Sequence, residues 1–262
     1  MRRYFRLLYF LAKNNLAREF EFRSYLVIRW LTDLIWVALQ LILIVVFFSF
    51  SPQILGWNRY EIFMFTGLFR VIKGVFDTFA RRNIHYLPEN INRGDLDYAL
   101  TRPVNSLFLM SFRYHALGET SSVVSGFIIF IWAFSQLGSG IGLIQIVSLL
   151  VLIITGVIIL YCLVLGFAIL SFFTTRLTAL SSYYEVLSNT LRFPTDIYHR
   201  YHPLLDVILL PLVFAVTFPT KIFLNRLPAA FLFLQILAAA ITLFLVYRFW
   251  HFALRHYSSA SS

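Results

Sequence analysis

Charged side chains are scarce in this sequence. Only 13% of its 262 residues are Asp, Glu, Lys or Arg, against about 25% in soluble domains, and 60% are hydrophobic. A surface made from this composition could not be solvated all round, which argues against a soluble enzyme, a disordered chain and a nucleic-acid module. Among the charged residues the acidic ones are fewer, 12 against 22 basic ones. Because the basic residues flank long apolar runs, this excess indicates membrane orientation.

Cysteine and catalytic motifs are also nearly absent. Cys162 is the only cysteine, which excludes an intramolecular disulfide framework and thiolate metal clusters. No Gly-x4-Gly-Lys-Ser/Thr phosphate loop is present, so ATP hydrolysis cannot be assigned to this chain. The pair His199 and His202, near Asp196 and Asp206, is a poor metal site. We therefore predict no catalytic, cofactor-binding or metal-binding residues.

Apolar runs long enough to cross a bilayer, about 20 residues each, dominate the sequence. Four are clear: Leu34–Phe50, which continues back to residue 25, 107–136, 143–173 and Leu227–Tyr247. The glycine-rich segment 138–142 predicts a turn between the second and third of these runs. Tyr60–Ala80 is a weaker span because it carries Arg70, Lys73 and Asp77.

The region 176–225 leaves two alternatives for a further span. In one, the polar helix Leu177–Phe193 crosses the membrane with its polar side toward a subunit interface or a wet cavity, because lipid could not satisfy those groups. In the other, this helix lies on the cytoplasmic surface and residues 203–220 cross the membrane. The positive-inside rule favours this second alternative, since Arg192 and Arg200 would then lie inside the cell. Either way we predict an all-α membrane protein with six transmembrane helices in a single domain, 1–262.

The distribution of Lys and Arg predicts the orientation of the spans. Residues 1–29 hold seven and 70–113 hold seven, whereas 51–59 holds one and 137–142 none. Both termini and the loop 81–106 are therefore expected in the cytoplasm. Apolar residues recur at three- and four-residue spacing over 2–22, which predicts an amphipathic helix in the headgroup plane, either a simple anchor or a lever that moves with a partner.

Charges within the second span fall on one helical face. Lys73, Asp77 and Arg81 follow at four-residue steps, and Arg70 lies one turn earlier, so these charges can neutralise each other. Either this half of the helix protrudes into the cytoplasm, or it forms a gate or a proton relay. Together with the polar helix, the candidate pathway-lining residues are Arg70, Lys73, Asp77, Tyr183, Tyr184, Glu185 and Asn189.

The loop Pro88–Val104 reads PENINRGDLDYALTRPV and predicts a short amphipathic helix. Pro88 and Glu89 suit a helix start, because proline fits the first turn and an acidic residue complements the helix dipole. Pro103 would stop the helix before the next span. Such a helix could lie passively on the membrane or insert into a cytoplasmic partner.

This loop resembles the coupling loop between the second and third spans of ABC-2 type (type-2 ABC exporter) permeases, in a branch of similar length. The shared pattern is I-x-x-G-x-L-D-x-x-L-x-R-P, here Ile91, Gly94, Leu96, Asp97, Leu100, Arg102 and Pro103. The segments RFPTDIYH (Arg192–His199) and LRHYSSAS (Leu254–Ser261) extend the resemblance over nearly the whole chain.

The resemblance implies a permease subunit of an exporter in the bacterial cell (inner) membrane. It would have an elbow helix over 1–24, six spans and re-entrant helices within 194–225 on the outer side. It would act as a homo- or heterodimer with two separate ATPase subunits, which supply the ATP and Mg site. Implied ATPase-coupling residues are Glu89, Ile91, Gly94, Asp95, Leu96, Asp97, Leu100 and Arg102. From the residues alone, a secondary transporter, a channel or a structural membrane subunit remain alternatives, and the substrate is not indicated.

Overall fold

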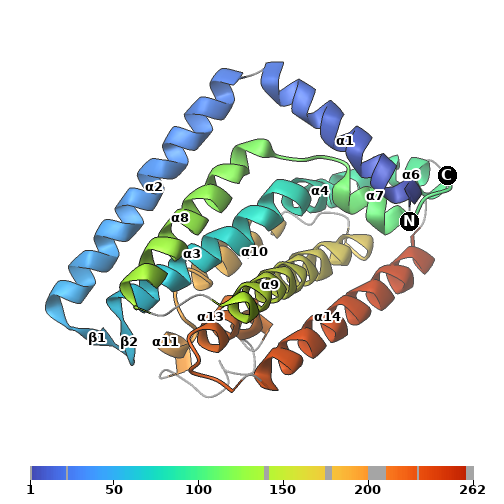
Figure 1. Cartoon of the computed structure of the whole chain (residues 1–262). Coiled ribbons are helices and arrows are strands. Elements are labelled where there is room, and N and C mark those ends of the chain that lie inside the picture. The colour runs from blue at the N-terminus through green and yellow to red at the C-terminus, as the bar shows by residue number, and fades with distance from the viewer. Residues whose placement is uncertain are drawn as a thin grey trace.

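The computed structural model describes residues 2–21, 23–138, 142–174, 179–199, 211–228 and 230–257. These residues are almost entirely helical (Figure 1). The elements are α1 (Arg2–Glu21), α2 (Arg23–Phe50), β1 (Gln53–Ile54), β2 (Trp57–Asn58), α3 (Arg59–Phe76), η1 (Asp77–Arg81), α4 (Arg82–His85), α5 (Leu87–Asn92), α6 (Asp95–Leu100), α7 (Ser106–Phe112), η2 (Leu117–Glu119), α8 (Thr120–Gln136), α9 (Leu143–Ile169), η3 (Leu170–Phe172), α10 (Leu180–Thr190), α11 (Asp196–His199), η4 (Val213–Thr217), α13 (Phe218–Phe223) and α14 (Ala230–Arg255).

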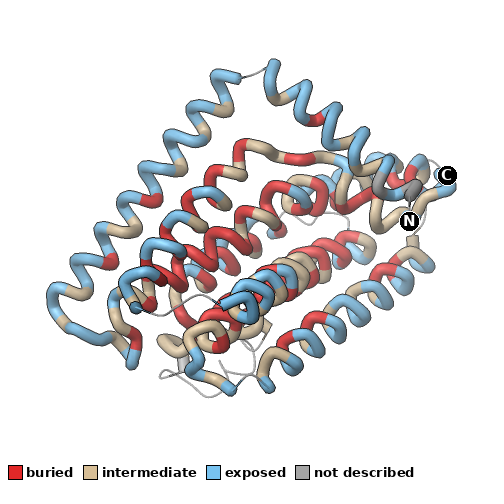
Figure 2. The backbone as a smooth tube through the Cα atoms, viewed as in Figure 1, coloured by how far each residue is buried: buried red, intermediate tan, exposed pale blue. Residues whose placement is uncertain are grey.

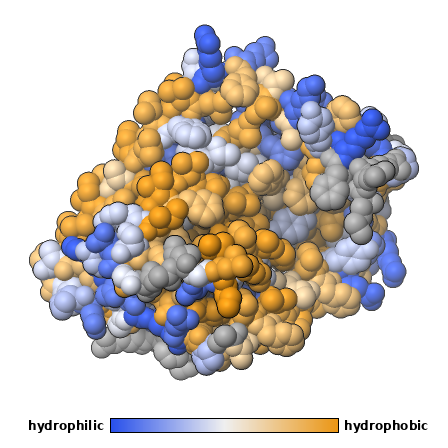
Figure 3. Space-filling model, viewed as in Figure 1, coloured by the Kyte–Doolittle hydropathy of each residue, from blue (hydrophilic) through white to orange (hydrophobic). Residues whose placement is uncertain are grey.

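Four helical stretches are long and apolar enough to cross a membrane: Arg23–Phe50, Leu117–Gln136, Leu143–Phe172 and Ala230–Arg255. They correspond to the four clear apolar runs of the sequence. The second begins at residue 117 and not at 107, because α7 is a separate helix and 113–116 is not helical. The chain is therefore a mostly helical, multi-pass membrane protein. Figure 3 shows hydrophobic side chains across the middle of the molecule, and hydrophilic ones mostly near its edges, where helices end.

Helix α3 lies at the centre of the bundle. Every residue from Phe63 to Ile72 is buried, and the tube in Figure 2 shows the buried positions concentrated on α3, α8 and α9, whereas α2 and α14 are exposed along most of their length. The weakest apolar run of the sequence is thus the best shielded helix. A polar side chain on α3 meets other protein groups and not lipid, which is why charges are tolerated there.

Two glycines allow α3 and α8 to touch backbone to backbone. A Cβ atom on Gly67 would lie 2.6 Å from the backbone nitrogen of Phe130, and one on Gly126 would lie 2.8 Å from the carbonyl oxygen of Gly67. Small residues at such crossings let membrane helices approach closely. This contact fixes the position of α3 against α8.

The short elements divide between two ends of the bundle (Figure 1). The hairpin end carries β1, β2, α11 and α13, and the loop end carries α5, α6, the first turns of α1 and the last turns of α14. At the hairpin end Trp57 Nε1 donates to Asp196 Oδ2 at 2.9 Å, and Lys221 Nζ lies 2.6 Å from Asp196 Oδ1. The described parts of 194–225 therefore gather at the hairpin end, opposite the coupling loop; residues 200–210 lie outside the described part of the chain.

Helix α1 runs across the loop end and packs along the segment 105–117. The amide Nδ2 of Asn15, a buried residue, donates to the carbonyl oxygen of Arg113 at 3.0 Å and lies 3.2 Å from His115 Nδ1. Glu19 accepts from the backbone nitrogen of Leu117 at 2.8 Å. Burial lowers the pKa of His115, so its ring is held neutral beside Asn15.

Candidate functional site

The loop Pro88–Val104, which resembles a coupling loop, contains two helices and not one. Gly94 separates α5 from α6 with a φ of +77°, a left-handed conformation that glycine adopts without the steric cost of a Cβ atom. Pro88 lies in the first turn of α5, as expected. The sequence prediction of a single helix was wrong because the left-handed residue interrupts the helix in the middle of the apolar pattern.

The family-like residues of this loop divide into an anchor and an exposed surface. Ile91 and Leu96 are buried, and they hold the loop on the bundle. The exposed residues of the loop include Glu89, Arg93, Asp95, Tyr98, Leu100 and Arg102, which we call the coupling tip. Within it Arg93 pairs with Glu89 at 2.7 Å, and the Arg102 guanidinium lies 4.1 Å from the centre of the Tyr98 ring. The tip therefore presents a preformed charged and aromatic surface.

Asp97 differs from the other loop residues because it contacts the C-terminal segment. It lies beside Tyr257, and burial together with the Asp97 charge raises the pKa of the Tyr257 hydroxyl. The structure thus brings together two sequence motifs, the loop and the tail Leu254–Ser261, whose described part ends at residue 257. Sequence reasoning did not join them, because nothing in the pattern of either motif indicates the other.

Asp77 is the centre of a buried charge cluster, the Asp77 cluster, formed with Lys73, Arg81 and Tyr184. The Asp77 carboxylate is 1% exposed; it pairs with Lys73 and accepts a hydrogen bond from the Tyr184 hydroxyl, and Arg81 Nη1 lies 3.9 Å away. Arg81 also lies over the Tyr184 ring at 4.4 Å. Both ion pairs expected from the four-residue spacing are present. The cluster lies where α3 passes into η1, a π-helical turn of the kind that is frequent at functional sites.

Arg70 belongs to a second cluster. Its guanidinium lies 2.6 Å from Asp33 Oδ2 on α2 and 2.8 Å from Ser125 Oγ on α8, and nearby Arg29 pairs with Glu119. Sequence reasoning missed Asp33 and Arg29, although Asp33 is the only acidic residue of α2, a signal that could have identified it.

A cavity of about 650 Å³ opens beside these pairs. Its walls come from α2, the middle of α3, the start of α8 and the residues that follow α10. It is lined by Arg29, Thr32, Asp33, Trp36, Leu39, Gln40, Leu43, Phe69, Arg70, Lys73, Glu119, Ser122, Arg192 and Phe193. Of the predicted pathway residues, Arg70 and Lys73 line this cavity.

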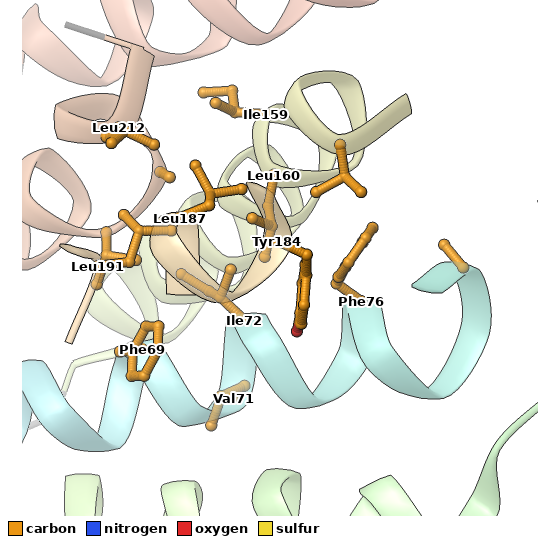
Figure 4. Packing of buried hydrophobic residues seen from close by; sticks show 14 of the residues in the cluster. Phe69, Val71, Ile72, Phe76, Ile159, Leu160, Tyr184, Leu187, Leu191 and Leu212 are labelled. Atoms are coloured by element: carbon orange, nitrogen blue, oxygen red, sulfur yellow. The ribbon is translucent and has the colours of Figure 1, made fainter. Parts of the chain in front are cut away.

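Apart from Asp77 on η1, the other pathway candidates lie on α10, which packs one face on α3 and α9. Tyr184, Leu187 and Leu191 point into the core in Figure 4, and Tyr183 stacks on Phe167 with ring centres 4.1 Å apart. The opposite face carries Glu185 and Asn189, which are exposed, and the exposed Arg192 follows the end of the helix. The four-residue spacing of Glu185 and Asn189 places these two in one row. Structure and sequence agree that this helix has a polar side, and the bundle leaves that side uncovered.

No group of three His, Cys, Asp or Glu side chains that could hold a metal ion occurs among the described residues. The histidine pair named from the sequence falls outside them, since neither the side chain of His199 nor any part of His202 is described.

Comparison with protein-family models assigns most of the chain to a known family. The family model for ABC-2 family transporter proteins matches residues 34–261, which include the whole of α3, α8, α9 and α14 and the part of α2 from Leu34 onward. No match is found among curated proteins or among solved structures. The chain belongs to the ABC-2 transporter family, and it is a multi-pass membrane permease of ABC-type transport, a transport component and not itself the catalytic one.

Proposed function

We propose that this permease belongs to an exporter in which two permeases, identical or homologous, pair with two ATPase subunits seated on the coupling tips. The observation that carries this proposal is the division of the loop into a buried anchor, Ile91 and Leu96, and an exposed charged tip. ABC-2 permeases generally work with ABC ATPases. A loop that only lay on the membrane would not need an exposed charged surface held on a fixed base.

The uncovered face of α10 supports a second permease in the assembly. Glu185 and Asn189 are exposed on a helix whose other side packs on α3 and α9, and Arg192 is exposed just after it. In hydrocarbon these groups would lose their hydrogen bonds with water, which costs several kcal/mol for each group. A second copy facing this row would enclose it in a polar pathway at the interface. The second and fifth spans of the chain, which would line this pathway, would then be α3 and α10.

The chain offers a direct mechanical link from the tip to this pathway. From Arg59 to Asn92 the backbone is helical except at Tyr86, so α3, η1, α4 and α5 connect the Asp77 cluster to the anchor of the tip. Closure of the ATPases would move the tip and tilt this column. The free energy would come from the different affinity of ATP for the two states of the complex.

A proton-coupled secondary transporter is the second candidate, because the Asp77 carboxylate is buried at the centre of the bundle. It predicts transport in vesicles without ATP, and loss of transport when Asp77 or Glu185 is neutralised. An exporter driven by an ATPase predicts no transport without ATP.

Truncating the tip should uncouple transport from ATP hydrolysis. We expect Arg102→Ala and Leu100→Ala to leave insertion and thermal stability unchanged, since both side chains are exposed and surface substitutions usually change stability by less than about 0.5 kcal/mol. ATP-driven transport should fall about tenfold or more, as expected when a contact at the centre of an interface is lost. Transport and hydrolysis are measured together in vesicles that contain the complete complex.

Glu21→Gln is the matched control, because Glu21 is exposed on α1 and lies outside the loop. Normal transport and normal stimulation of the ATPase in both tip variants would contradict the coupling role. Purification of the complex adds a further check: we expect an associated subunit that carries a phosphate loop.

A further inference from the structure

The cavity beside α2 combines an apolar wall with a cluster of cations. Trp36, Leu39, Leu43, Phe69 and Phe193 supply large apolar side chains, and Arg29, Arg70, Lys73 and Arg192 supply positive charge. Its volume of about 650 Å³ lies within the range of small-molecule sites, roughly 300–1,000 Å³. Such a lining fits a ligand that has both an apolar part and a polar group.

The charge of the lining favours an anion. Four cations line the cavity, but only two carboxylates do, Asp33 and Glu119, which leaves an excess of two positive charges. The excess stays the same when Asp77 and Arg81 are counted as well, because one adds a negative charge and the other a positive one. Glu185, on α10, lies seven residues before Arg192 and does not line the cavity.

Arg192 accounts for one of these two charges, and the other is Arg81, which shares the Asp77 carboxylate with Lys73. Arg29 is paired with Glu119, Arg70 with Asp33 and Lys73 with Asp77. Among the residues that the structure describes, Arg192 has no carboxylate partner, and its side chain is exposed. An arginine without a carboxylate partner, at a cavity whose other cations are ion-paired, is available to bind an anionic ligand.

We infer that this cavity binds the anionic group of an amphipathic molecule, a phosphate or a carboxylate attached to an apolar chain. The Arg192 guanidinium would hold the anion, since its fixed fork of donors matches the oxygens of phosphate and carboxylate. The apolar chain would lie against the wall formed by Trp36, Leu39 and Phe193. A small inorganic anion would leave this wall bare, and a neutral amphiphile would leave the excess charge unbalanced.

The role of the bound molecule as the exported cargo rests on the proposed function, whereas its binding to the cavity does not. The site is lined by the middle of α3 and by Arg192 and Phe193, which follow α10, so it adjoins the proposed pathway. A molecule held there would contact α3, the helix that the coupling tip is proposed to tilt. The class of cargo would then be amphipathic organic anions.

Native mass spectrometry of the purified full-length permease, together with whatever subunits associate with it, tests the binding. The probes are phosphatidylglycerol and phosphatidylcholine with identical acyl chains, with inorganic phosphate as a competitor. We expect retention of the anionic lipid in preference to the zwitterionic one, and about tenfold weaker retention in Arg192→Gln, the loss of one hydrogen bond to a charged group. Arg59→Gln is the matched control, because Arg59 is exposed at the hairpin end and outside the cavity.

Equal binding of the two lipids, wild-type affinity in Arg192→Gln, or an equal loss in Arg59→Gln would overturn the inference. Displacement of the lipid by inorganic phosphate at an equal concentration would overturn its amphipathic part and leave a small-anion site. If lipid selectivity is found but no associated subunit carries a phosphate loop, the proposed function fails while the site stands. If such a subunit is present without lipid selectivity, the site fails while the proposed function stands.

Discussion

Replacement of Asp77 with asparagine is expected to lower the free energy of unfolding by about 3–5 kcal/mol, the cost of leaving a buried charge without its partner. The Asp77 carboxylate is almost fully buried, and it is the counter-ion of Lys73 and the acceptor for the Tyr184 hydroxyl. The neutral amide would leave the Lys73 ammonium uncompensated and would weaken the attachment of α10 to α3. Thermal unfolding of the purified protein, followed by intrinsic fluorescence, measures the effect.

The double variant Lys73→Gln with Asp77→Asn separates charge imbalance from loss of packing. Because it removes the cation as well as the anion, it should recover a large part of the lost stability. Glu21→Gln, which neutralises an exposed carboxylate on α1, should unfold like the wild type. A single variant Asp77→Asn as stable as Glu21→Gln would show that the cluster does not hold α10 in place.

Valine at Gly67 is expected to have a comparably large effect, through sterics and not through charge. Any Cβ atom at this position would lie 2.6 Å from the Phe130 backbone nitrogen and 2.8 Å from the Gly126 carbonyl oxygen. Neither atom is on a flexible side chain, so the two helices would have to separate. Overpacking of this kind costs about 1–3 kcal/mol and occasionally more, and we expect the upper end of that range for Gly67→Val, with Gly67→Ala intermediate.

Gly166→Ala is the matched control, because Gly166 is also a glycine within a helix. Its Cβ would meet a single side-chain atom of Val246 at 3.6 Å, an ordinary van der Waals distance. Alanine has the higher helix propensity by about 1 kcal/mol, so this variant should be as stable as the wild type or slightly more so. Unfolding temperatures that are equal for Gly67→Val and Gly166→Ala would contradict the close crossing of α3 and α8.

Features that depend on local sequence were predictable. The four apolar runs became the four long apolar helices, because length and hydropathy alone decide that property. The four-residue spacing of Lys73, Asp77 and Arg81 predicted their ion pairs, since helical neighbours meet whatever the rest of the fold does. Residues 2–21 form the amphipathic helix α1 for the same reason.

Features that depend on contacts between distant segments were not predictable. Arg70 finds Asp33 on α2, and Asp97 lies beside Tyr257 at the other end of the chain; no periodicity connects these positions. Gly94 was recognised as part of a motif, but its left-handed conformation, which splits the coupling loop, was not. The cavity was not predictable for the same reason, because its lining comes from four separate segments of the chain.

The central claim, that the coupling tip is seated on a partner ATPase inside the cell, can be measured with one cysteine. Leu100→Cys places a thiol on the exposed tip, while the native Cys162 is buried and so does not compete for labelling. We predict that a thiol-reactive photo-cross-linker attached at residue 100 joins the permease to a subunit with a phosphate loop, and that ATP changes the yield. Labelling of residue 100 by a membrane-impermeant maleimide added to intact cells, or the absence of any cross-linked subunit in the intact assembly, would contradict the account.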